Sequence, residues 1–172
     1  KVENFANEYK TKLHIIEIND YLDSTLPDII NKINKPVCSI CGMIKRYIMN
    51  NEAKKLGIDV VCTGHNLDDE IATLMGNILH WQIEYLSRQY PTLNEKEGFI
   101  RKTKPLVLCS DKETLCYATI NDIDYDAEQC PYSHKATSLF YKHIFNLIET
   151  EMTGTKLNFL SNYFKKARSY FN

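Results

Sequence analysis

Two cysteines three residues apart open a stretch with helical spacing, in the segment KPVCSICGMIKRY at residues 35–47. On the first turn of a helix, cysteines at positions i and i+3 face the same way, and the helix N-terminus stabilises thiolates. Lys45 and Arg46 add positive charge one turn later. Cys38 and Cys41 therefore fit half of a metal or cluster site, a thioredoxin-like redox pair, or two ordinary core cysteines.

A third cysteine stands in a comparable setting in CPYS, residues 130–133. Cys130 precedes Pro131, which is predicted to lie just inside a new helix start, so that the thiolate would meet free backbone N–H groups. This setting resembles that of many cluster ligands, and a loop cysteine without a role is the alternative. The long separation from Cys41 excludes a compact zinc knuckle but allows a site that the fold assembles.

A histidine and three acids follow one another in TGHNLDDE, residues 63–70, directly after an apolar run. In an open parallel sheet, ligands bind beyond the carboxyl ends of the strands. Helix capping by Asn66 and favourable charge at a helix N-terminus account for one or two of the acids. Capping and terminal charge account less well for His65 beside three acids. An adjacent pair of carboxylates could instead hold Mg²⁺ or position a nucleotide. The residues that crowd this position are His65, Asn66, Asp68, Asp69 and Glu70.

The elements that must position these residues alternate between strands and helices. Apolar runs predict strands at 13–18 and 58–63, and RKTKPLVL predicts a further strand or extended segment. Spacing and caps predict helices at 26–33, from Cys38 to about Lys55, from Leu67 onward, after Asp111 as a cap, at 134–150 and after Gly154. Residues 90–98 are predicted to form a polar loop. This order indicates an α/β domain with a parallel sheet and an all-helical C-terminal third.

The composition is that of an ordinary globular protein, with 172 residues, 44% hydrophobic and 25% charged. The net charge of −1 gives no global basic field for nucleic acid. No stretch resembles a membrane span or a signal peptide, so we expect a cytoplasmic protein with reduced thiols. Cys62 and Cys109 lie in or after apolar runs and are predicted to be buried. The chain begins inside a helical pattern, which suggests a fragment.

Together, CSICGMIKRY, TGHNLDDE, RKTKPL and CPYS, in this order and spacing, resemble the tRNA 2-thiolation proteins of the PP-loop ATP pyrophosphatase (adenine nucleotide α-hydrolase-like) superfamily. The resemblance runs from about Leu13 to Lys166 and is nearest to the thermophile and archaeal tRNA 2-thiouridine synthetases. It implies a partial Rossmann-like α/β fold, in which helices flank a parallel sheet. It divides the chain into a partial nucleotide-binding domain at 1–110 and a helical C-terminal extension of the same domain at 111–172.

The resemblance further implies that Cys38, Cys41 and Cys130 ligate a [4Fe–4S] cluster, whose fourth iron stays free to carry sulfur. Zinc is the alternative metal for these three cysteines. In the family, MgATP adenylates the C2 carbonyl oxygen of a tRNA pyrimidine, and cluster-bound sulfide then displaces AMP. The expected activity is therefore that of a tRNA sulfurtransferase.

The ATP site that the resemblance implies takes its residues from two of these motifs. Lys45 matches a basic residue near the ATP phosphates, and Asp69 matches a catalytic residue on the ATP and Mg²⁺ side. Gly64 and His65 belong to the same nucleotide-binding set. Lys45 and Mg²⁺ would offset the phosphate charge that builds up during adenylation.

The sequence departs from the family pattern in two places. The ATP-binding SGGxDS loop is expected upstream of residue 1 and does not occur in the sequence, and neither do the terminal CxxC zinc fingers. This chain alone is therefore expected to be inactive. A zinc-stabilised binding module without catalytic activity and a CxxC dithiol oxidoreductase remain alternatives.

The implied partners are tRNA, a sulfur donor and a second copy of the chain in a homodimer. The donor is either a ubiquitin-like sulfur carrier or free sulfide, and no membrane partner is expected. A C-terminal basic tail without acids is predicted to contact tRNA phosphates. Its residues are Lys156, Lys165, Lys166 and Arg168.

Overall fold

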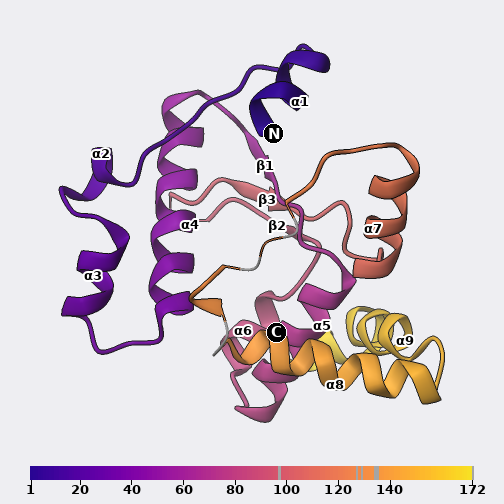
Figure 1. The fold of residues 1–172 in the computed structure, drawn as a ribbon. Helices are drawn as coiled ribbons and strands as arrows, with labels where there is room; N and C mark the ends of the chain where they lie inside the picture. Colours follow the sequence, from indigo (N-terminus) through magenta and orange to yellow (C-terminus); the bar gives the residue numbers. More distant parts are fainter. Residues whose placement is uncertain (97, 127, 129, 134–135, 172) are drawn as a thin grey trace.

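The computed structural model describes residues 1–172 except 97, 127, 129, 134–135 and 172. Its longest helix, α4 (Val37–Lys55), runs beside the central sheet (Figure 1). Gly57, with φ of +66°, lies in the left-handed region just after this helix. Glycine adopts this conformation without steric cost and commonly ends helices in this way. The helix and its end are therefore where the sequence predicts them.

A small core joins α4 to the segment that precedes it in the chain. Ile40, Ile44 and Ile48 are four residues apart and share one face of α4. This face packs against α2 (Asn19–Leu22) and α3 (Leu26–Lys32). The helix predicted at 26–33 is thereby confirmed.

Within the described residues, three short strands form the sheet, in the order β1–β3–β2. β1 (Val60–Cys62) and β3 (Arg101–Thr103) run parallel, whereas β2 (Thr92–Leu93) pairs with β3 in the antiparallel direction. The sheet is therefore mixed, whereas the sequence predicts a purely parallel sheet. The difference arises because the predicted loop at 90–98 contains β2, which folds back onto β3.

The strand predicted at 13–18 and the predicted burial of two cysteines are both wrong. Residues 13–17 have no regular secondary structure and pair with no described strand, and Ile18 has an αR backbone as the N-cap of α2, so the predicted strand does not form. Cys62 is exposed and Cys109 is half-buried, although both were expected in the interior. Cys62 lies in an apolar run, but its burial requires a neighbouring layer, which the described residues do not provide beside β1. Cys109 lies in the turn before α7, next to its N-cap Ser110.

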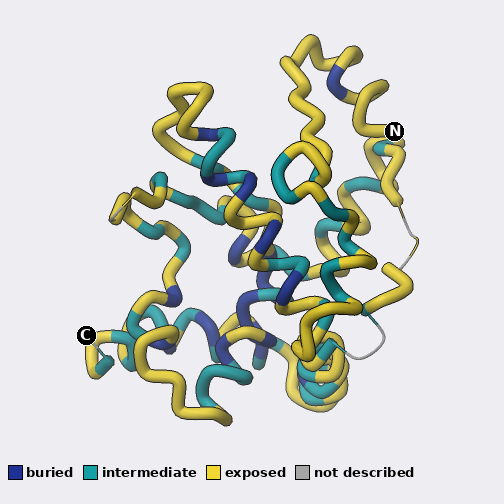
Figure 2. The backbone as a smooth tube through the Cα atoms, turned by 90° about the vertical axis from the view of Figure 1, so that its left-hand side faces the viewer, coloured by how far each residue is buried: buried dark blue, intermediate teal, exposed yellow. Residues whose placement is uncertain are grey.

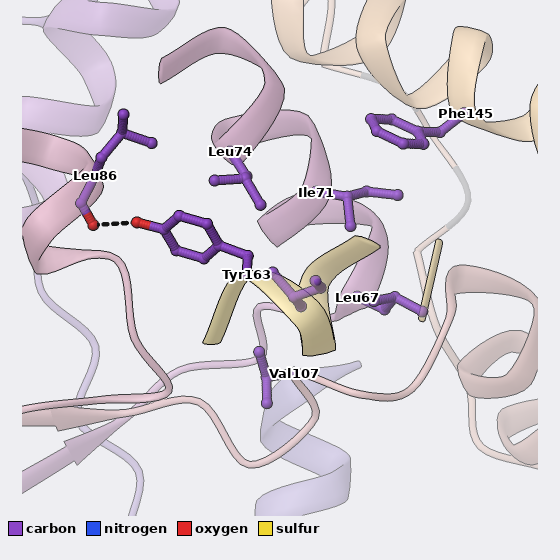
Figure 3. Close-up of a cluster of buried hydrophobic side chains, with 8 residues drawn as sticks. Leu67, Ile71, Leu74, Leu86, Val107, Phe145 and Tyr163 are labelled. Carbon is purple, nitrogen blue, oxygen red and sulfur yellow. Dashed lines mark hydrogen bonds between the residues drawn. The ribbon is translucent and has the colours of Figure 1, made fainter. Parts of the chain in front are cut away.

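The larger core is built around α5 (Leu67–Leu79), whose Ile71 and Leu74 are completely buried. Helices α8 (Thr137–Glu151) and α9 (Thr155–Asn162) pack against it. Tyr163 lies in this core and donates its hydroxyl hydrogen bond to the backbone carbonyl of Leu86 (Figure 3). The core thus fixes α5 relative to the C-terminal helices.

The other described helices are short and surround these two cores (Figure 1). Ser110 caps the helix that begins at Asp111, so the cap lies one residue earlier than predicted. Figure 2 shows that buried residues are concentrated along α4, α5 and their neighbours, whereas the first 36 residues are mostly exposed. The short helices outside the two cores' main elements are α1 (Val2–Glu8), α6 (Ile83–Arg88), α7 (Asp111–Ile120), the π-helical η2 (Tyr163–Ala167) and the 3₁₀-helical η3 (Arg168–Phe171).

The side chain of Glu149, on α8, caps the N-terminus of α9. Its carboxylate accepts hydrogen bonds from the backbone N–H groups of Lys156, at 2.8 Å, and Gly154, at 2.6 Å. These bonds, that of Lys156 first, hold the pKa of Glu149 below its ordinary value. A carboxyl group with a lowered folded-state pKa stabilises the fold above its unfolded pKa, and this contribution is lost as the pH falls through the folded pKa.

We therefore expect Glu149→Gln to lower the free energy of unfolding at pH 7 by about 1 kcal/mol, the size of a helix-cap contribution. The difference from the parent should vanish well below pH 4, where both side chains are neutral. Urea unfolding at pH 7 and pH 3 measures both values, with Glu151→Gln on the exposed end of α8 as the control. An equal loss at both pH values would contradict the capping role.

Candidate functional site

The fold brings the start of the CxxC helix next to the CPYS turn. The Sγ atom of Cys38 lies 3.8 Å from the carbonyl oxygen of Tyr132, which is 94 residues further along the chain. Cys38 and Cys130 are exposed, Cys41 is half-buried, and all three thiols are free. Two motifs that are distant in sequence therefore lie side by side at the surface.

The CPYS segment forms a turn at Pro131 and Tyr132 and is 3₁₀-helical at Ser133, two residues after Pro131, where the helix was predicted to start. The backbone N–H of Ser133 donates to the carbonyl oxygen of Cys130 at 2.9 Å, and the Ser133 hydroxyl donates to the same oxygen at 2.7 Å. Helix α8 begins only at Thr137, and residues 134–135 of the predicted helix lie outside the described residues. Among the described residues, the helix N-terminus that can favour a thiolate here is that of α4, whose second residue is Cys38.

Within the described part of the chain, no group of three or more histidine, cysteine, aspartate or glutamate side chains is arranged to hold a metal ion. Cys38, Cys41 and Cys130 thus lie on neighbouring segments without forming a closed set of ligands. Their assignment as cluster ligands stays a prediction.

The acids of TGHNLDDE are divided among three different lysines. All three acids lie in the first turn of α5. Their partners come from elsewhere in the fold, and no local pattern in the sequence indicates these pairings. Buried carboxylates need such partners, because an unpaired charge in the interior is costly. The pairs are Asp68 with Lys156, Asp69 with Lys142 at 2.7 Å, and Glu70 with Lys104 at 2.8 Å.

Asp69 is the acid that stays accessible. Its side chain is 33% exposed, against 1% for Asp68 and 3% for Glu70. The adjacent pair of carboxylates that the sequence suggested for Mg²⁺ is therefore not available as a pair, because Asp68 is buried with its lysine. Asp69 also caps α5 reciprocally with Asn66, whose backbone N–H donates to its carboxylate at 3.2 Å.

Lys142 of α8 joins the starts of two helices. Its ammonium group lies 2.7 Å from Asp69, at the start of α5, and 3.1 Å from Asp111, at the start of α7. Burial lowers the pKa of Lys142, but the hydrogen bonds and charges of Asp69 and then Asp111 outweigh it, so the pKa lies above the ordinary value of a lysine. Lys142 therefore keeps its proton and holds the Asp69 carboxylate in place at neutral pH.

His65 and Gly64 occupy the loop between β1 and α5. The Nδ1 atom of His65 lies 2.8 Å from the hydroxyl of Thr63, and the histidine is exposed. A Cβ atom on Gly64 would meet nothing within 4 Å, so this loop is open to solvent. Lys45 is exposed and lines the same groove as Cys62, at the end of β1. Gly64 and His65 thus follow the carboxyl end of β1 directly, where open α/β sheets bind ligands, and Asp69 lies in the first turn of the helix that comes next.

The basic tail is only partly available to RNA. Lys156 is 5% exposed and paired with Asp68, so its predicted contact with tRNA phosphates is wrong. The Arg168 guanidinium lies 4.5 Å from the ring centre of Tyr90 and is half-buried. Lys165 and Lys166 are exposed. The sequence could not distinguish the buried from the exposed basic residues, because their burial depends on which side chains the fold packs around them.

No protein-family model matches the chain. The chain is 45% identical over 169 residues to the tRNA-5-methyluridine(54) 2-sulfurtransferase of Thermotoga maritima, a match that covers 97% of this chain and 56% of that relative. It is 34% identical to the cytoplasmic tRNA 2-thiolation protein 1 of Caenorhabditis elegans, over 78% of this chain and 36% of that relative. The chain spans about half the length of the curated sulfurtransferases that it matches.

Among solved structures, the fold is similar to the U34-tRNA thiolase NcsA from Methanococcus maripaludis with its [4Fe–4S] cluster. The TM-score is 0.84 at 27% identity, and the match covers 98% of this chain and 56% of the thiolase. The predicted fold class is confirmed by this similarity, with the mixed sheet described above. Over the part of their length that it spans, the chain is therefore similar to proteins named as tRNA sulfurtransferases and to a tRNA thiolase.

Proposed function

We propose that this chain is part of a tRNA 2-thiolation sulfurtransferase, and that it carries the cluster-binding cysteines and one side of the nucleotide site. The observation that carries the proposal is the contact between the CxxC helix and the CPYS turn, where Cys38 Sγ lies 3.8 Å from Tyr132. The matched relatives are named as sulfurtransferases that act on tRNA, and the solved thiolase holds a [4Fe–4S] cluster.

The chemistry of the donor set fits such a cluster. Cysteine thiolates are the usual ligands of [4Fe–4S] clusters. Cys38 lies in the first turn of α4, where unpaired N–H groups favour a thiolate, and Cys41 lies one turn further along the helix. Cys130 lies two residues before the carbonyl group that Cys38 approaches. A cluster held by these three cysteines supplies an iron with an open position, at which sulfur can be held for transfer.

Lys45 and Asp69 serve the ATP side of the proposed site. A carbonyl oxygen is a poor leaving group until it is adenylated, and the ammonium of Lys45 offsets the phosphate charge in that step. The partly exposed carboxylate of Asp69 suits Mg²⁺, which prefers oxygen ligands. Lys142 keeps this carboxylate oriented. Gly64 and His65, in the loop between β1 and α5, would bind the nucleotide beside Asp69.

The proposed substrate is tRNA, as the names of the relatives support. Lys165 and Lys166 are exposed and supply phosphate contacts that depend on salt but not on sequence. The sulfur donor is a ubiquitin-like carrier or free sulfide, and the protein acts as a homodimer. The cytoplasm is the proposed location, which the name of the C. elegans relative supports. No helix in the described part of the chain is long and apolar enough to cross a membrane.

Anaerobic reconstitution of the 172-residue chain with ferrous iron and sulfide tests the proposal. We expect about four iron atoms per chain and a broad visible absorption that bleaches on reduction. A colourless protein that binds one zinc ion instead indicates a binding module. A protein that binds neither metal but cycles between dithiol and disulfide near the potential of thioredoxin, about −270 mV, indicates an oxidoreductase.

A further inference from the structure

Three basic side chains that come from different elements form a patch beside the central strand. Arg46 lies on α4, Lys102 on β3 and Arg88 in the last turn of α6. Arg46 and Arg88 are exposed, whereas Lys102 is half-buried. In the part of the chain that the structure describes, none of the three forms an ion pair. We call these three residues the basic patch.

The position of Arg46 follows from the way in which α4 packs against the segment before β3. The buried Asn50 donates from its side-chain amide to the carbonyl oxygen of Gly98 at 3.2 Å, and its side-chain oxygen accepts from the backbone N–H of Ile100 at 3.0 Å. One turn further along α4, Nζ of Lys54 lies 3.1 Å from the point where a Cβ atom on Gly98 would stand. Successive turns of α4 therefore match successive positions of this segment, in opposite directions.

The same register places Arg46 beside Lys102. Arg46 lies one turn before Asn50, so the two share a face of α4. Lys102 lies two residues after Ile100, so these two side chains share a face of the extended segment. Burial first, and then the charges of Arg46 and Arg88, lower the pKa of Lys102. Like charges have this effect on an ammonium group only at short range, so the three cations are neighbours that repel one another.

Arg88 approaches β3 from the side of β2. It ends α6, five residues before Leu93 of β2, which pairs with Lys102. Tyr90 lies between the helix and the strand, and the guanidinium of Arg168 lies 4.5 Å from the centre of its ring. Basic groups therefore continue from α4, across β3, to the C-terminal η3.

Gly42 lets the patch extend towards the cysteines. A Cβ atom on Gly42 would lie 3.3 Å from a guanidinium nitrogen of Arg46, so a larger residue there would crowd this side chain. Arg46 thus lies back along α4, and Gly42 directly follows Cys41. Lys45 belongs to a different surface, the groove beside β1, and Arg46 is not among the described residues that line it. The basic patch is therefore next to the CxxC cysteines and separate from the groove of Lys45.

We propose that the basic patch binds backbone phosphates of the RNA whose base is brought to the cysteines. This step rests on the proposed function, because it takes that RNA to be the substrate. Phosphates relieve the repulsion among cations that have no described counterion. Guanidinium groups such as those of Arg46 and Arg88 also bind phosphate oxygens through paired hydrogen bonds.

An exposed aromatic ring beside the patch favours RNA over an acidic protein surface. Phe99 is 55% exposed, and its ring centre lies 5.9 Å from Nζ of Lys102. Bases stack on such rings while the neighbouring phosphates bind cations. RNA therefore supplies a partner for the ring as well as for the three charges, whereas acidic side chains supply one for the charges alone.

Binding of tRNA to the 172-residue chain at a series of salt concentrations tests this site, without iron or ATP. Fluorescence anisotropy of end-labelled tRNA gives the affinity at each concentration. Arg46→Gln/Lys102→Gln/Arg88→Gln is expected to weaken binding at least about tenfold. The slope of log affinity against log salt concentration should become shallower by about 2 to 3, the value for three lost phosphate contacts.

Two further variants separate the basic patch from the total charge. Lys10→Gln/Lys12→Gln/Lys32→Gln removes three exposed lysines near the N-terminus, which changes the net charge equally. It should leave the affinity within about twofold of the parent, because these lysines lie away from the proposed contact. Arg46→Lys/Arg88→Lys keeps the charge of the patch and should keep the salt dependence of the parent.

A measurement on the parent chain does not depend on the folding of any variant. An amine-acylating reagent labels the chain with and without tRNA, and mass spectrometry locates the labelled lysines. Lys102 should be labelled more slowly when tRNA is bound, because the phosphates cover it. Lys12 and Lys32 should be labelled at the same rate in both samples.

Each outcome decides the proposal. Parent-like affinity and salt dependence of the glutamine variant of the patch would overturn it, and so would an equal loss in the N-terminal lysine variant. Labelling of Lys102 that tRNA leaves unchanged would also overturn it, as would a chain that does not bind tRNA.

Three other results separate this site from the alternatives. If the glutamine variant of the patch loses binding of ATP or inorganic phosphate but keeps that of tRNA, the patch serves a free anion and the proposal fails. If poly-glutamate binds to the parent chain as tightly as tRNA, the partner is an acidic protein and the proposal also fails. A chain that binds tRNA through the patch but takes up no iron keeps this site and rejects the iron–sulfur cluster.

Discussion

Cys130→Ser is expected to remove the iron centre of the reconstituted chain, with iron falling from about four atoms per chain to fewer than about one. Thiolates are soft ligands that select iron–sulfur centres, and a serine hydroxyl does not replace them. Cys130 lies on the turn that reaches Cys38, as the 3.8 Å contact at Tyr132 shows. Iron analysis and visible absorption after anaerobic reconstitution measure the loss.

The chain supplies its own matched control for this experiment. Cys116 is also a free, exposed cysteine, but it lies on α7, away from the CxxC helix and the CPYS turn. Cys116→Ser should keep the iron content and the absorption of the parent. Cys38→Ser and Cys41→Ser should match Cys130→Ser. If Cys130→Ser retains full iron while the other two lose it, the third ligand is a different residue and the three-cysteine site is wrong.

Lys156→Met is expected to destabilise the protein by about 3–5 kcal/mol. The substitution removes the ammonium group from Asp68, which is 1% exposed and would be left as a buried charge without its cation. For a chain of this length, such a loss lowers the melting temperature by roughly 6–20 °C. Urea unfolding and thermal denaturation followed by circular dichroism give both values.

Two further variants separate the buried charge from other effects of this substitution. Lys165→Met removes a lysine from the exposed surface nearby and should change stability by less than about 0.5 kcal/mol. Lys156→Met/Asp68→Asn removes both charges and should recover a large part of the loss, because a neutral amide at this position no longer needs a cation. A double variant as unstable as Lys156→Met would show that the lost packing of the lysine stem, rather than the charge, holds the helices together.

Much of the helical structure could be predicted from neighbouring residues alone. The spacing of Ile40, Ile44 and Ile48 defines the buried face of α4, and Gly57 marks its end. Asn66 begins α5 through a capping box with Asp69. These features depend on contacts within one or two turns of the chain, and such contacts are already present in the order of the residues.

The β structure was predicted less well, because a strand exists only by pairing with another strand. Residues 13–18 have the composition of a strand, yet they form none, because they lack a described partner strand. The polar segment at 90–98 has little strand character but contains β2, because it folds back onto β3. In both cases the neighbour, and not the local sequence, decided the outcome.

The sequence by itself determined the motifs of this protein: CxxC at the start of a helix, CPYS far downstream, and TGHNLDDE after an apolar strand. Only the tertiary structure decided what each residue faces. It placed Cys38 against Tyr132, buried Asp68 with Lys156, and left Asp69 partly exposed beside Lys142. These contacts join residues 73 to 94 positions apart. Side chains at such separations meet only because the apolar cores fix the helices that carry them, and no local pattern encodes which of several lysines or acids is drawn inside.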